Sequence, residues 1–464
     1  MIYLKRVSIW KDGNYKKFPI LDEDKDVDLL IIGGGITGSS LLYHLKKSNL
    51  KVLLAEQNRV GYSVTGSSTG KLNFLQNDLI DSIRNNFNDE VARLYLKSQM
   101  DSIRKIVDVT SKENIDCDIK KVNSYLYTNK DNEIDKIKEV KKFLNESGIE
   151  VFDGKSDLVK SKYMIYVEGT YVFHPIKFIH GLIDDCDNVY EKTSIKKIEK
   201  RGEKYICHTG RNVIKTKYVA VCSHYPFFNI PFLFPIKGSL EKSYLSACKS
   251  RVNPISLISY SKPFISIRTH KDYLIYLSNS DSLNKCTDNS KNFDELCKKI
   301  SDLNIYPDYL WSNIDVMTND CLPYIGKIKD NMFIATGYNT WGLTNGFLAG
   351  SIISDILMNR DNEYVKLFNP KRVNAIKYLK TITDIYENIS GYVKGFNSSN
   401  KSIKKSKDGK STLKVHGSSL SNKCPHMGCG LIYNCIEKTF DCPCHGSRFD
   451  INGKCLSGPA NEDI

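Results

Sequence analysis

The pattern of apolar and polar positions divides the first sixty residues into a strand, a helix and a second strand. Residues 27–32 are apolar except for one aspartate, as in a strand that is buried on both faces of a parallel sheet. Residues 39–47 place three leucines at helical spacing, and residues 51–55 form a second apolar run. The pattern therefore predicts a βαβ unit in which a helix connects two parallel strands.

Farther along the chain the same reasoning predicts both helices and antiparallel strands. Apolar residues recur at helical spacing over 79–112 and 131–147, and a third helix is expected at 343–358 after a glycine-rich turn. The stretch 189–222 is predicted to form strands. Residues 255–280 alternate apolar and polar positions, which is typical of an antiparallel sheet.

Length and composition indicate more than one domain. The chain has 464 residues and a hydrophobic fraction of 41%, which is ordinary for a packed protein and allows two or three domains. Residues 391–412 are mostly Gly, Ser, Asn and Lys, a composition typical of a linker. We therefore expect a small separate domain after this segment.

The net charge of +14 arises from lysines that are spread through the whole chain. This distribution favours a solvated basic surface over a nucleic-acid site, and a basic face could steer an acidic electron-transfer partner.

No apolar run approaches the ~20 residues of a membrane span, and residues 1–18 lack the apolar core of a signal peptide. Most cysteines outside the C-terminal region are scattered singly, as in a reducing compartment. We predict a cytoplasmic protein without a nucleic-acid partner or a membrane span, and leave its oligomeric state open.

The last forty-one residues contain two short motifs that can bind metal. Cys424-Pro-His426 and Cys442-Pro-Cys-His445 each offer one thiolate and one imidazole. Two thiolates on one iron and two imidazoles on the other form the ligand set of a Rieske [2Fe–2S] centre. Zinc sites more often combine a Cys-x-x-Cys pair with a His-x-x-x-His pair, so zinc is the weaker alternative, and a purely structural cysteine cluster is weaker still. The motifs predict Cys424, His426, Cys442 and His445 as cluster ligands.

The βαβ unit carries a second motif, Gly33-x-Gly35-x-x-Gly38, between its first strand and its helix. In a dinucleotide-binding fold the first glycine permits the tight turn, the second lets the backbone approach a pyrophosphate, and the third lets helix and strand pack closely. Glu56 ends the second strand and is placed to accept hydrogen bonds from a ribose diol. A glycine-rich turn that binds nothing is the alternative. The motif leaves open whether the dinucleotide is NAD or FAD.

Beyond these motifs, the chain resembles the glycine oxidase and D-amino acid oxidase superfamily of flavoproteins. More narrowly, it resembles the subfamily in which this flavoprotein is fused to a C-terminal Rieske domain, over about residues 27–365 and 415–460. The resemblance implies FAD as the dinucleotide. The segments that carry it are 27–56, 61–71 (GYSVTGSSTGK), 173–175 (FHP), 193–195 (TSI), 321–326 (CLPYIG), 333–337 (FIATG) and 341–346 (WGLTNG).

The resemblance also implies the fold and the cofactor contacts. We expect an α/β chain with a Rossmann-like FAD-binding domain of the glutathione-reductase type, an α+β substrate domain and a small all-β Rieske domain. The implied FAD-binding domain comprises 1–80, 165–240 and 315–390, the substrate or cap domain 81–164 and 241–314, the linker 391–412 and the Rieske domain 413–464. The implied FAD contacts are Gly33, Gly35, Ile36, Thr37, Gly38, Glu56, Gln57, Thr69, Gly70, Lys71, Ile195, Gly337, Gly342, Leu343 and Thr344.

Members of this superfamily oxidise an amine, an amino acid or a related small molecule by hydride transfer to the flavin. The protein then supplies orientation and electrostatics and needs no obligatory acid or base, so the catalytic residues stay unassigned. Candidate substrate contacts are Arg268, Tyr273, Trp341 and Asn345, of which Arg268 could clamp a carboxylate or be an ordinary sheet arginine. His174 precedes a proline and is better interpreted as a structural turn residue.

The fused cluster implies that electrons leave singly, toward an external one-electron acceptor, although the opposite direction with a donor protein is also open. By the same resemblance Ser447 hydrogen-bonds a bridging sulfide, which raises the cluster potential. Cys429 and Cys444 lie beside the ligand turns and can join the two loops as a disulfide.

Two other functions compete with this one. A Rieske oxygenase would need a mononuclear iron held by two histidines and a carboxylate. The only close histidine pair outside the cluster, His174 and His180, lacks a suitably placed acid. A non-catalytic redox sensor or electron-transfer protein is the stronger alternative, although no recognition module is visible in the sequence. Neither the substrate nor the electron acceptor can be identified from the sequence.

Overall fold

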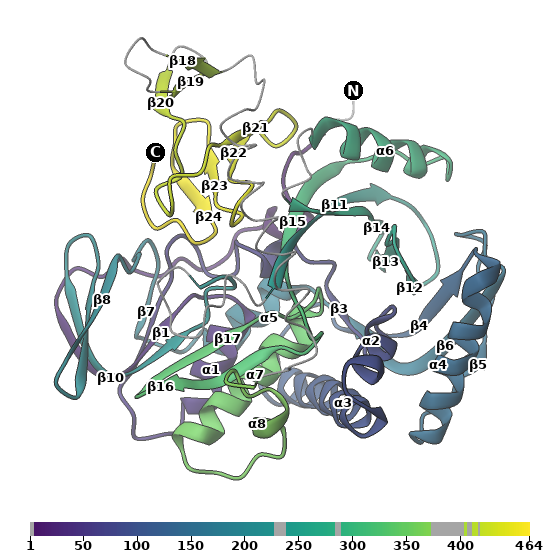
Figure 1. The fold of residues 1–464 in the computed structure, drawn as a ribbon, viewed down its shortest axis with the longest axis horizontal. Helices are drawn as coiled ribbons and strands as arrows, with labels where there is room; N and C mark the ends of the chain where they lie inside the picture. Colours follow the sequence, from purple (N-terminus) through teal and green to yellow (C-terminus); the bar gives the residue numbers. More distant parts are fainter. Residues whose placement is uncertain (1–3, 227–237, 284–288, 373–402, 406–410, 416–417) are drawn as a thin grey trace.

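The computed structural model describes residues 4–226, 238–283, 289–372, 403–405, 411–415 and 418–464. Two large sheets form the body of the protein, and two small sheets at the C-terminal end form a separate layer above them (Figure 1). The predicted fold class is confirmed: an α/β body is followed by an all-β domain. Within the described part of the chain, no helix has both the length and the apolar content that a membrane crossing requires.

The predicted βαβ unit lies at the centre of an eight-stranded sheet. Strand β1 (Lys25–Ile32) pairs in parallel with β2 (Val52–Ala55) and with β10 (Val213–Val221), and helix α1 (Ile36–Leu45) connects β1 to β2. The helix begins three residues before the predicted start because it opens inside the glycine motif. The other strands of this sheet are β7 (Val189–Tyr190), β8 (Lys197–Arg201), β9 (Lys204–His208), β16 (Tyr324–Lys329) and β17 (Met332–Thr336).

Helix α7 (Gly342–Leu357) lies directly against α1. A side chain on Gly350 would come within 2.5 Å of the backbone nitrogen of Leu41, so the two helices can approach this closely only because the residue is glycine. This packing brings the N-termini of both helices to the same end of the sheet. Helix α5 (Pro175–Ile183) also packs on α1.

The second sheet has nine strands, and it contains the antiparallel stretch predicted at 255–280. That stretch forms β12 (Ser256–Ser259), β13 (Ser266–His270) and β14 (Tyr273–Ser282). Its remaining strands are β3 (Lys71–Leu72), β4 (Lys120–Thr128), β5 (Phe152–Asp153), β6 (Tyr163–Val172), β11 (Gly238–Lys249) and β15 (Tyr309–Thr318).

The predicted helix at 79–112 is two helices, α2 (Leu79–Asn86) and α3 (Asp89–Lys112). The break occurs because the side chain of Asn88 accepts a hydrogen bond from Val91 N at 2.9 Å and starts a new helix there. The helix predicted at 131–147 is α4 (Ile134–Glu146). Helices α6 (Asn289–Ser301) and α8 (Tyr364–Leu367) and the 3₁₀ turns Ile9–Lys11, Thr65–Ser67 and Asp131–Glu133 complete the body.

The C-terminal domain consists of two antiparallel sheets. The first contains β18 (Ile403–Lys405), β19 (Ser411–Val415) and β20 (Ser418–Ser421), and the second β21 (Ile432–Asn434), β22 (Thr439–Asp441), β23 (Arg448–Asp450) and β24 (Cys455–Ser457). The predicted linker 391–412 needs correction, because 403–405 and 411–412 belong to paired strands. Their lysines, serines and threonines lack the alternation that marks a half-buried strand. Residues 391–402 lie outside the described residues, and the assigned domain boundaries stay a prediction.

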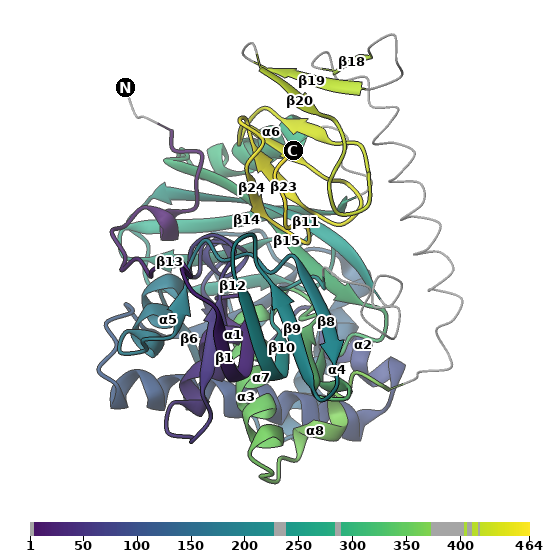
Figure 2. The same cartoon turned by 90° about the vertical axis from the view of Figure 1, so that its left-hand side faces the viewer.

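The C-terminal domain rests on β11 and β15 of the nine-stranded sheet, as both views show (Figures 1 and 2). Lys242 on β11 forms an ion pair with Asp441 on β22, and the two atoms Nζ and Oδ2 lie 2.6 Å apart. Both side chains are almost fully buried. The contact between the domains is therefore a packed interface that contains charge.

Candidate active site and metal centre

The glycine motif takes the geometry that a dinucleotide site needs. Gly33 has a φ of +108°, which favours glycine, and its amide donates to Ala55 O at 2.9 Å. A Cβ on Gly38 would lie 2.0 Å from the carbonyl oxygen of Gly33, so no larger residue fits there. Gly35 caps helix α1, and the helix N-terminus faces an open cavity that can receive a phosphate.

Glu56 lies at the carboxyl end of β2, beside this helix terminus. Its carboxylate accepts hydrogen bonds from the backbone amides of Gly34 and Asn58, each at 2.8 Å. Burial raises the pKa of Glu56, and these two amide donors oppose the rise. The carboxylate retains free lone pairs on the cavity side, which fits a contact with a ribose diol.

A single cavity of about 200 Å³ joins the two large sheets. It extends from Glu56 to the N-terminus of α7 and is lined by most of the residues predicted to bind FAD. The predicted contacts that line it are Gly33, Gly35, Ile36, Thr37, Glu56, Gln57, Thr69, Lys71, Ile195, Gly342 and Leu343. Four other predicted contacts are absent from the lining: Gly38, Gly70, Gly337 and Thr344.

The side of the cavity next to β3 carries a buried cation. Lys71 is 4% exposed, and its ammonium donates to Leu257 O at 2.8 Å. Burial lowers the pKa of Lys71 well below its usual range, and the nearby charge of Arg268 lowers it further. Within the described residues, no carboxylate pairs with Lys71. A flavin or a substrate in this cavity would therefore meet an amine that loses its proton easily.

Strands β11, β13, β14 and β15 of the nine-stranded sheet also line the cavity, and the face that they present is largely polar. Asp315 on β15 pairs in register with Glu241 on β11. Burial, followed by the charge of Glu241, raises the pKa of Asp315 to about 7. Glu241 is satisfied by Ser280 and by an ion pair with Lys262. The lining residues on this face are Ser243, Leu245, Ser266, Leu277, Ser280, Asn313 and Asp315.

Sequence reasoning missed this polar face because β11 and β15 were not predicted. A signal was present, since residues 311–316 alternate between the two faces of the strand. Strand β15 presents Asn313 and Asp315 to the cavity and Ser312 and Ile314 to the opposite side.

Of the four candidate substrate contacts, only Trp341 lines the cavity. Arg268 is fully buried elsewhere: its guanidinium lies 4.8 Å from the ring of Trp10 and donates to Phe173 O at 3.2 Å. Arg268 is absent from the cavity lining, but its Nε and Nη1 atoms are buried without a hydrogen-bond partner among the described residues, so its role as a carboxylate clamp stays a prediction.

The other two candidates also lie outside the cavity lining. Asn345 is held between helices α3 and α7, where its side chain accepts from Gln99 Nε2 at 2.9 Å and donates to Trp341 O at 3.0 Å. The ring of Tyr273 packs against Tyr309, with 5.8 Å between their centroids. Both are occupied by packing that the sequence did not reveal.

His174 has the structural role that was favoured for it. It caps helix α5 by accepting a hydrogen bond from Lys177 N at 3.3 Å, and its Nε2 lies 3.0 Å from Tyr15 Oη. This agrees with a turn histidine and with no contact to substrate.

The two predicted ligand turns of the C-terminal domain have the same backbone geometry. Gly428 N donates to Cys424 O at 2.8 Å, and Gly446 N donates to Cys442 O at 3.0 Å. Both glycines have left-handed φ angles, +74° and +76°. Each turn therefore bends back on itself in a way that presents its cysteine and its histidine on one side.

The side chains of these turns meet the requirements for a metal cluster. The imidazole rings of His426 and His445 lie 4.9 Å apart, and the Nδ1 atom of each is buried without a hydrogen-bond partner. Burial lowers the pKa of both to about 4, which keeps them in the neutral form that binds metal. Cys424 lies within hydrogen-bonding reach of Cys442 and Ser447. The donor set fits a Rieske [2Fe–2S] centre.

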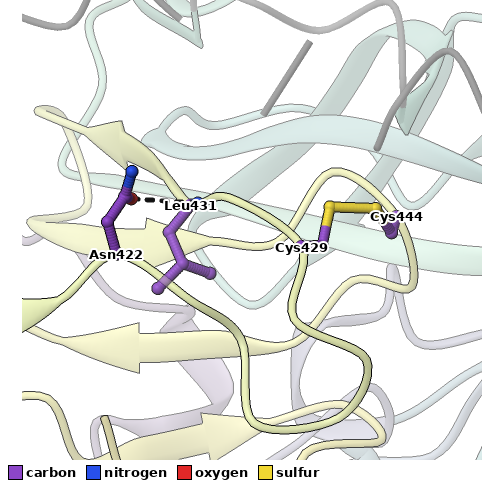
Figure 3. The surroundings of a disulfide bond; sticks show 4 residues. All are labelled: Asn422, Cys429, Leu431 and Cys444. Carbon is purple, nitrogen blue, oxygen red and sulfur yellow. Dashed lines mark hydrogen bonds between the residues drawn. A yellow bond between two sulfur atoms is a disulfide. The ribbon is translucent and has the colours of Figure 1, made fainter. Parts of the chain in front are cut away.

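A disulfide between Cys429 and Cys444 joins the two ligand turns, and the predicted pairing is confirmed (Figure 3). Next to it, Asn422 accepts a hydrogen bond from Leu431 N at 3.1 Å. The sulfur atoms of Cys429, Cys442 and Cys444 all lie within 4.8 Å of one another. Because two of them are bonded to each other, only Cys442 of this group keeps a thiolate for metal.

Removing this disulfide should weaken the C-terminal domain. The bond closes a loop of 15 residues, and a loop of this length contributes about 3 kcal/mol through the entropy of the unfolded chain. We expect the double variant Cys429→Ser/Cys444→Ser to lose about this much stability in chemical denaturation followed by cluster absorbance. The exposed free Cys435 provides the control, because Cys435→Ser should leave the midpoint unchanged. Equal midpoints for all three proteins would contradict the prediction.

One layer of sheet separates the cavity from the C-terminal domain. On the outer face of β15, Ser312 N donates to Glu437 at 3.0 Å, while Asp315 on the same strand lines the cavity. On β11, Lys242 contacts Asp441, while its neighbour Ser243 lines the cavity. The alternation of side chains along each strand thus places the cavity and the metal centre on opposite faces of one sheet.

A second connection runs around the edge of this sheet. The ring of Tyr225 lies 5.4 Å from that of the predicted ligand His445. The preceding residue, His224, lines the cavity. Two consecutive residues therefore link a predicted cluster ligand to the cavity wall.

Comparison with known proteins identifies both parts of the chain. Residues 28–356 match the FAD dependent oxidoreductase (DAO) family, and residues 401–464 match the Rieske [2Fe-2S] domain. YhfW of Bacillus subtilis, whose name describes a Rieske 2Fe-2S iron-sulfur protein, is 28% identical and aligns over 97% of this chain and 95% of its own length. Gamma-glutamylputrescine oxidoreductase of Escherichia coli is 22% identical over 74% of this chain and 87% of its own length.

Among solved structures, glycine oxidase from Geobacillus kaustophilus superposes with a TM-score of 0.64. The superposition covers 75% of this chain and 99% of that one, at 15% sequence identity. At this identity the likeness concerns the fold alone. It supports a shared overall architecture over three quarters of this chain.

Proposed function

Because the chain belongs to the FAD dependent oxidoreductase family and carries a Rieske [2Fe-2S] domain, we propose that it oxidises an amine-bearing small molecule and delivers the electrons singly to an external acceptor. The family implies FAD as cofactor, and the C-terminal domain implies the cluster. When bound, FAD supplies a hydride acceptor and the cluster supplies one-electron transfer. The residues described above would hold both groups within one chain.

The observation that carries this proposal is the shared sheet between cavity and cluster. Side chains on one face of β11 and β15 line the cavity, and side chains on the other face contact the C-terminal domain, so a single layer of backbone lies between the two sites. Tyr225 and His224 fill the space at the edge of the sheet. A metal centre placed there by a buried interface is well positioned to receive electrons from the cavity.

The substrate class is proposed from the polar face of the cavity. Asp315 lines the cavity, and within the described residues no lysine or arginine forms an ion pair with it. An ammonium group of the substrate would supply the missing positive charge. The names of two similar proteins refer to gamma-glutamylputrescine and to glycine, which both carry an amine. We therefore propose that Asp315 binds the substrate's ammonium group.

This role predicts a pH dependence. The pKa of Asp315 is raised to about 7 by burial and by Glu241, so its carboxylate is mostly protonated below that pH and mostly charged above it. For a cationic amine, kcat/KM should therefore rise with pH through an apparent pKa near 7. In the variant Asp315→Asn, this rise of kcat/KM with pH should disappear. Its kcat/KM should also fall about 10- to 100-fold, as expected for the loss of a charged hydrogen bond.

The matched control is Asn313→Ala on the same face of β15, which removes an amide but no charge. In this variant kcat/KM should still rise with pH through an apparent pKa near 7, and its value should change only modestly. An unchanged pH profile in Asp315→Asn would reject Asp315 as the ammonium contact. The profile is measured by stopped-flow reduction of the flavin at saturating and subsaturating amine.

The whole proposal is tested by anaerobic flavin bleaching with a panel of amines and amino acids, followed by EPR of the cluster. We expect bleaching by at least one amine and then the appearance of a reduced Rieske signal. A non-catalytic redox sensor is the competing function. Absence of flavin reduction by every compound, with a cluster that chemical reductants still reduce, would favour that sensor.

A further inference from the structure

The last turn of the C-terminal domain lines the same cavity as the glycine motif. Leu456, Ser457, Gly458 and Asn461 contribute to the cavity wall, although they belong to the cluster domain. We infer that this segment, residues 456–461, is part of the FAD site and encloses the adenosine half of the cofactor. The inference concerns cofactor binding, so it holds whatever the substrate and the electron acceptor are.

The segment is held by side chains that follow Glu56. Gln57 Nε2 donates to Ala460 O and to Cys455 Sγ, each at 3.1 Å. Asn58 Nδ2 donates to Leu456 O at 3.0 Å. The residues directly after the ribose-binding carboxylate are therefore bonded to the cluster domain.

A second set of contacts closes the opposite side of the segment. Asn461 Nδ2 donates to the carbonyl oxygens of Ile195 and Lys196, both at 3.2 Å. Ser194 Oγ donates to Asn461 O at 3.3 Å. Ser194 and Ile195 line the cavity as well. The segment thus spans the gap between the residues after β2 and the residues before β8.

These contacts place the segment at the adenosine end of the cavity. In a βαβ dinucleotide site, the pyrophosphate lies at the helix N-terminus and the adenosine ribose at the acidic residue that ends the second strand. Here that residue is Glu56, whose neighbours Gln57 and Asn58 bind the segment. Residues 456–458 and 461 therefore line the cavity beside the residue expected to bind the adenosine ribose.

The same segment also packs against the predicted cluster. Ala460 N donates to Ser447 Oγ at 3.0 Å. A Cβ on Gly458 would come within 2.5 Å of the Cα of Ser447, so the two backbones are in close contact. One short piece of chain therefore contacts both the metal centre and the adenosine pocket. By thermodynamic linkage, FAD binding and docking of the cluster domain stabilise each other.

The test measures FAD affinity in the full-length protein with an intact cluster. Asn461→Ala removes the bonds to Ile195 and Lys196 and should raise the FAD dissociation constant about 3- to 10-fold, the factor expected for one or two lost hydrogen bonds. Leu456→Ala, which truncates a side chain that is 40% exposed, is a second variant with little risk to folding. Equilibrium dialysis and flavin fluorescence give the constants, and cluster absorbance checks that the domain is intact.

ADP identifies which half of the cofactor is affected. Its dissociation constant, measured by competition with FAD, should rise by the same factor in Asn461→Ala. The matched control is Asn452→Ala, an exposed asparagine of the same domain that is absent from the cavity lining, and it should change neither constant. Unchanged FAD and ADP affinities in both Asn461→Ala and Leu456→Ala, or an equal change in the control, would overturn the inference.

Discussion

Turnover with a one-electron acceptor is expected to fall at least 100-fold in His445→Ala, while substrate still reduces the flavin. Mutation of a residue that only hydrogen-bonds a metal ligand commonly lowers metal affinity or activity 10- to 100-fold. Loss of a ligand itself should therefore lower activity by about 100-fold or more. His445 supplies one of the two imidazoles of the ligand turns, and its Nδ1 atom is buried without a hydrogen-bond partner. We expect that the cluster fails to assemble without this imidazole and that the proposed route for single electrons is then lost.

The measurement separates the two half-reactions. Anaerobic stopped-flow follows flavin reduction by substrate, and steady-state assays follow reduction of the acceptor, with excess FAD present because the cluster domain contributes to the FAD pocket. His208→Ala, a partly exposed histidine on β9, is the control and should behave as the native protein. Acceptor turnover that persists in a variant shown by EPR to lack the cluster would mean that electrons leave the flavin directly.

The parts that the sequence predicted well are those encoded by neighbouring residues. The glycine motif, Glu56 and the two ligand turns each depend on short-range geometry: a left-handed glycine, a close helix–strand contact, or a cysteine and a histidine on one turn. Such features depend little on the rest of the fold. This is why the predicted turns and the disulfide between Cys429 and Cys444 agree with the structure.

The parts that the sequence did not predict depend on contacts between distant segments. Arg268 looked available on a strand, but Trp10, some 260 residues earlier, covers its guanidinium. Asp315 became important only when β15 was placed between the cavity and the C-terminal domain. Nothing in the local sequence of segment 456–461 indicated that it reaches a second cofactor site.

Docking of the C-terminal domain gives the second large prediction. Lys242 and Asp441 form an ion pair with side chains only 1% and 5% exposed, and Arg448 also contacts Asp441. Removing one member of a buried pair leaves an uncompensated charge and typically costs 3–5 kcal/mol. We therefore expect Lys242→Met to destabilise the native protein by about this amount in chemical denaturation followed by cluster absorbance.

The double variant Lys242→Met/Asp441→Asn should recover much of this loss, because the orphaned charge is removed together with its partner. Lys204→Met provides the surface control: Lys204 pairs with Asp26 at 2.8 Å, but both side chains are about half exposed, and such pairs contribute about 0–1 kcal/mol. A loss of the same size in Lys204→Met would contradict a special role for the buried pair. The pair joins β22 of the C-terminal domain to β11 of the sheet that lines the cavity, so we expect its loss to weaken docking of the cluster domain on that sheet.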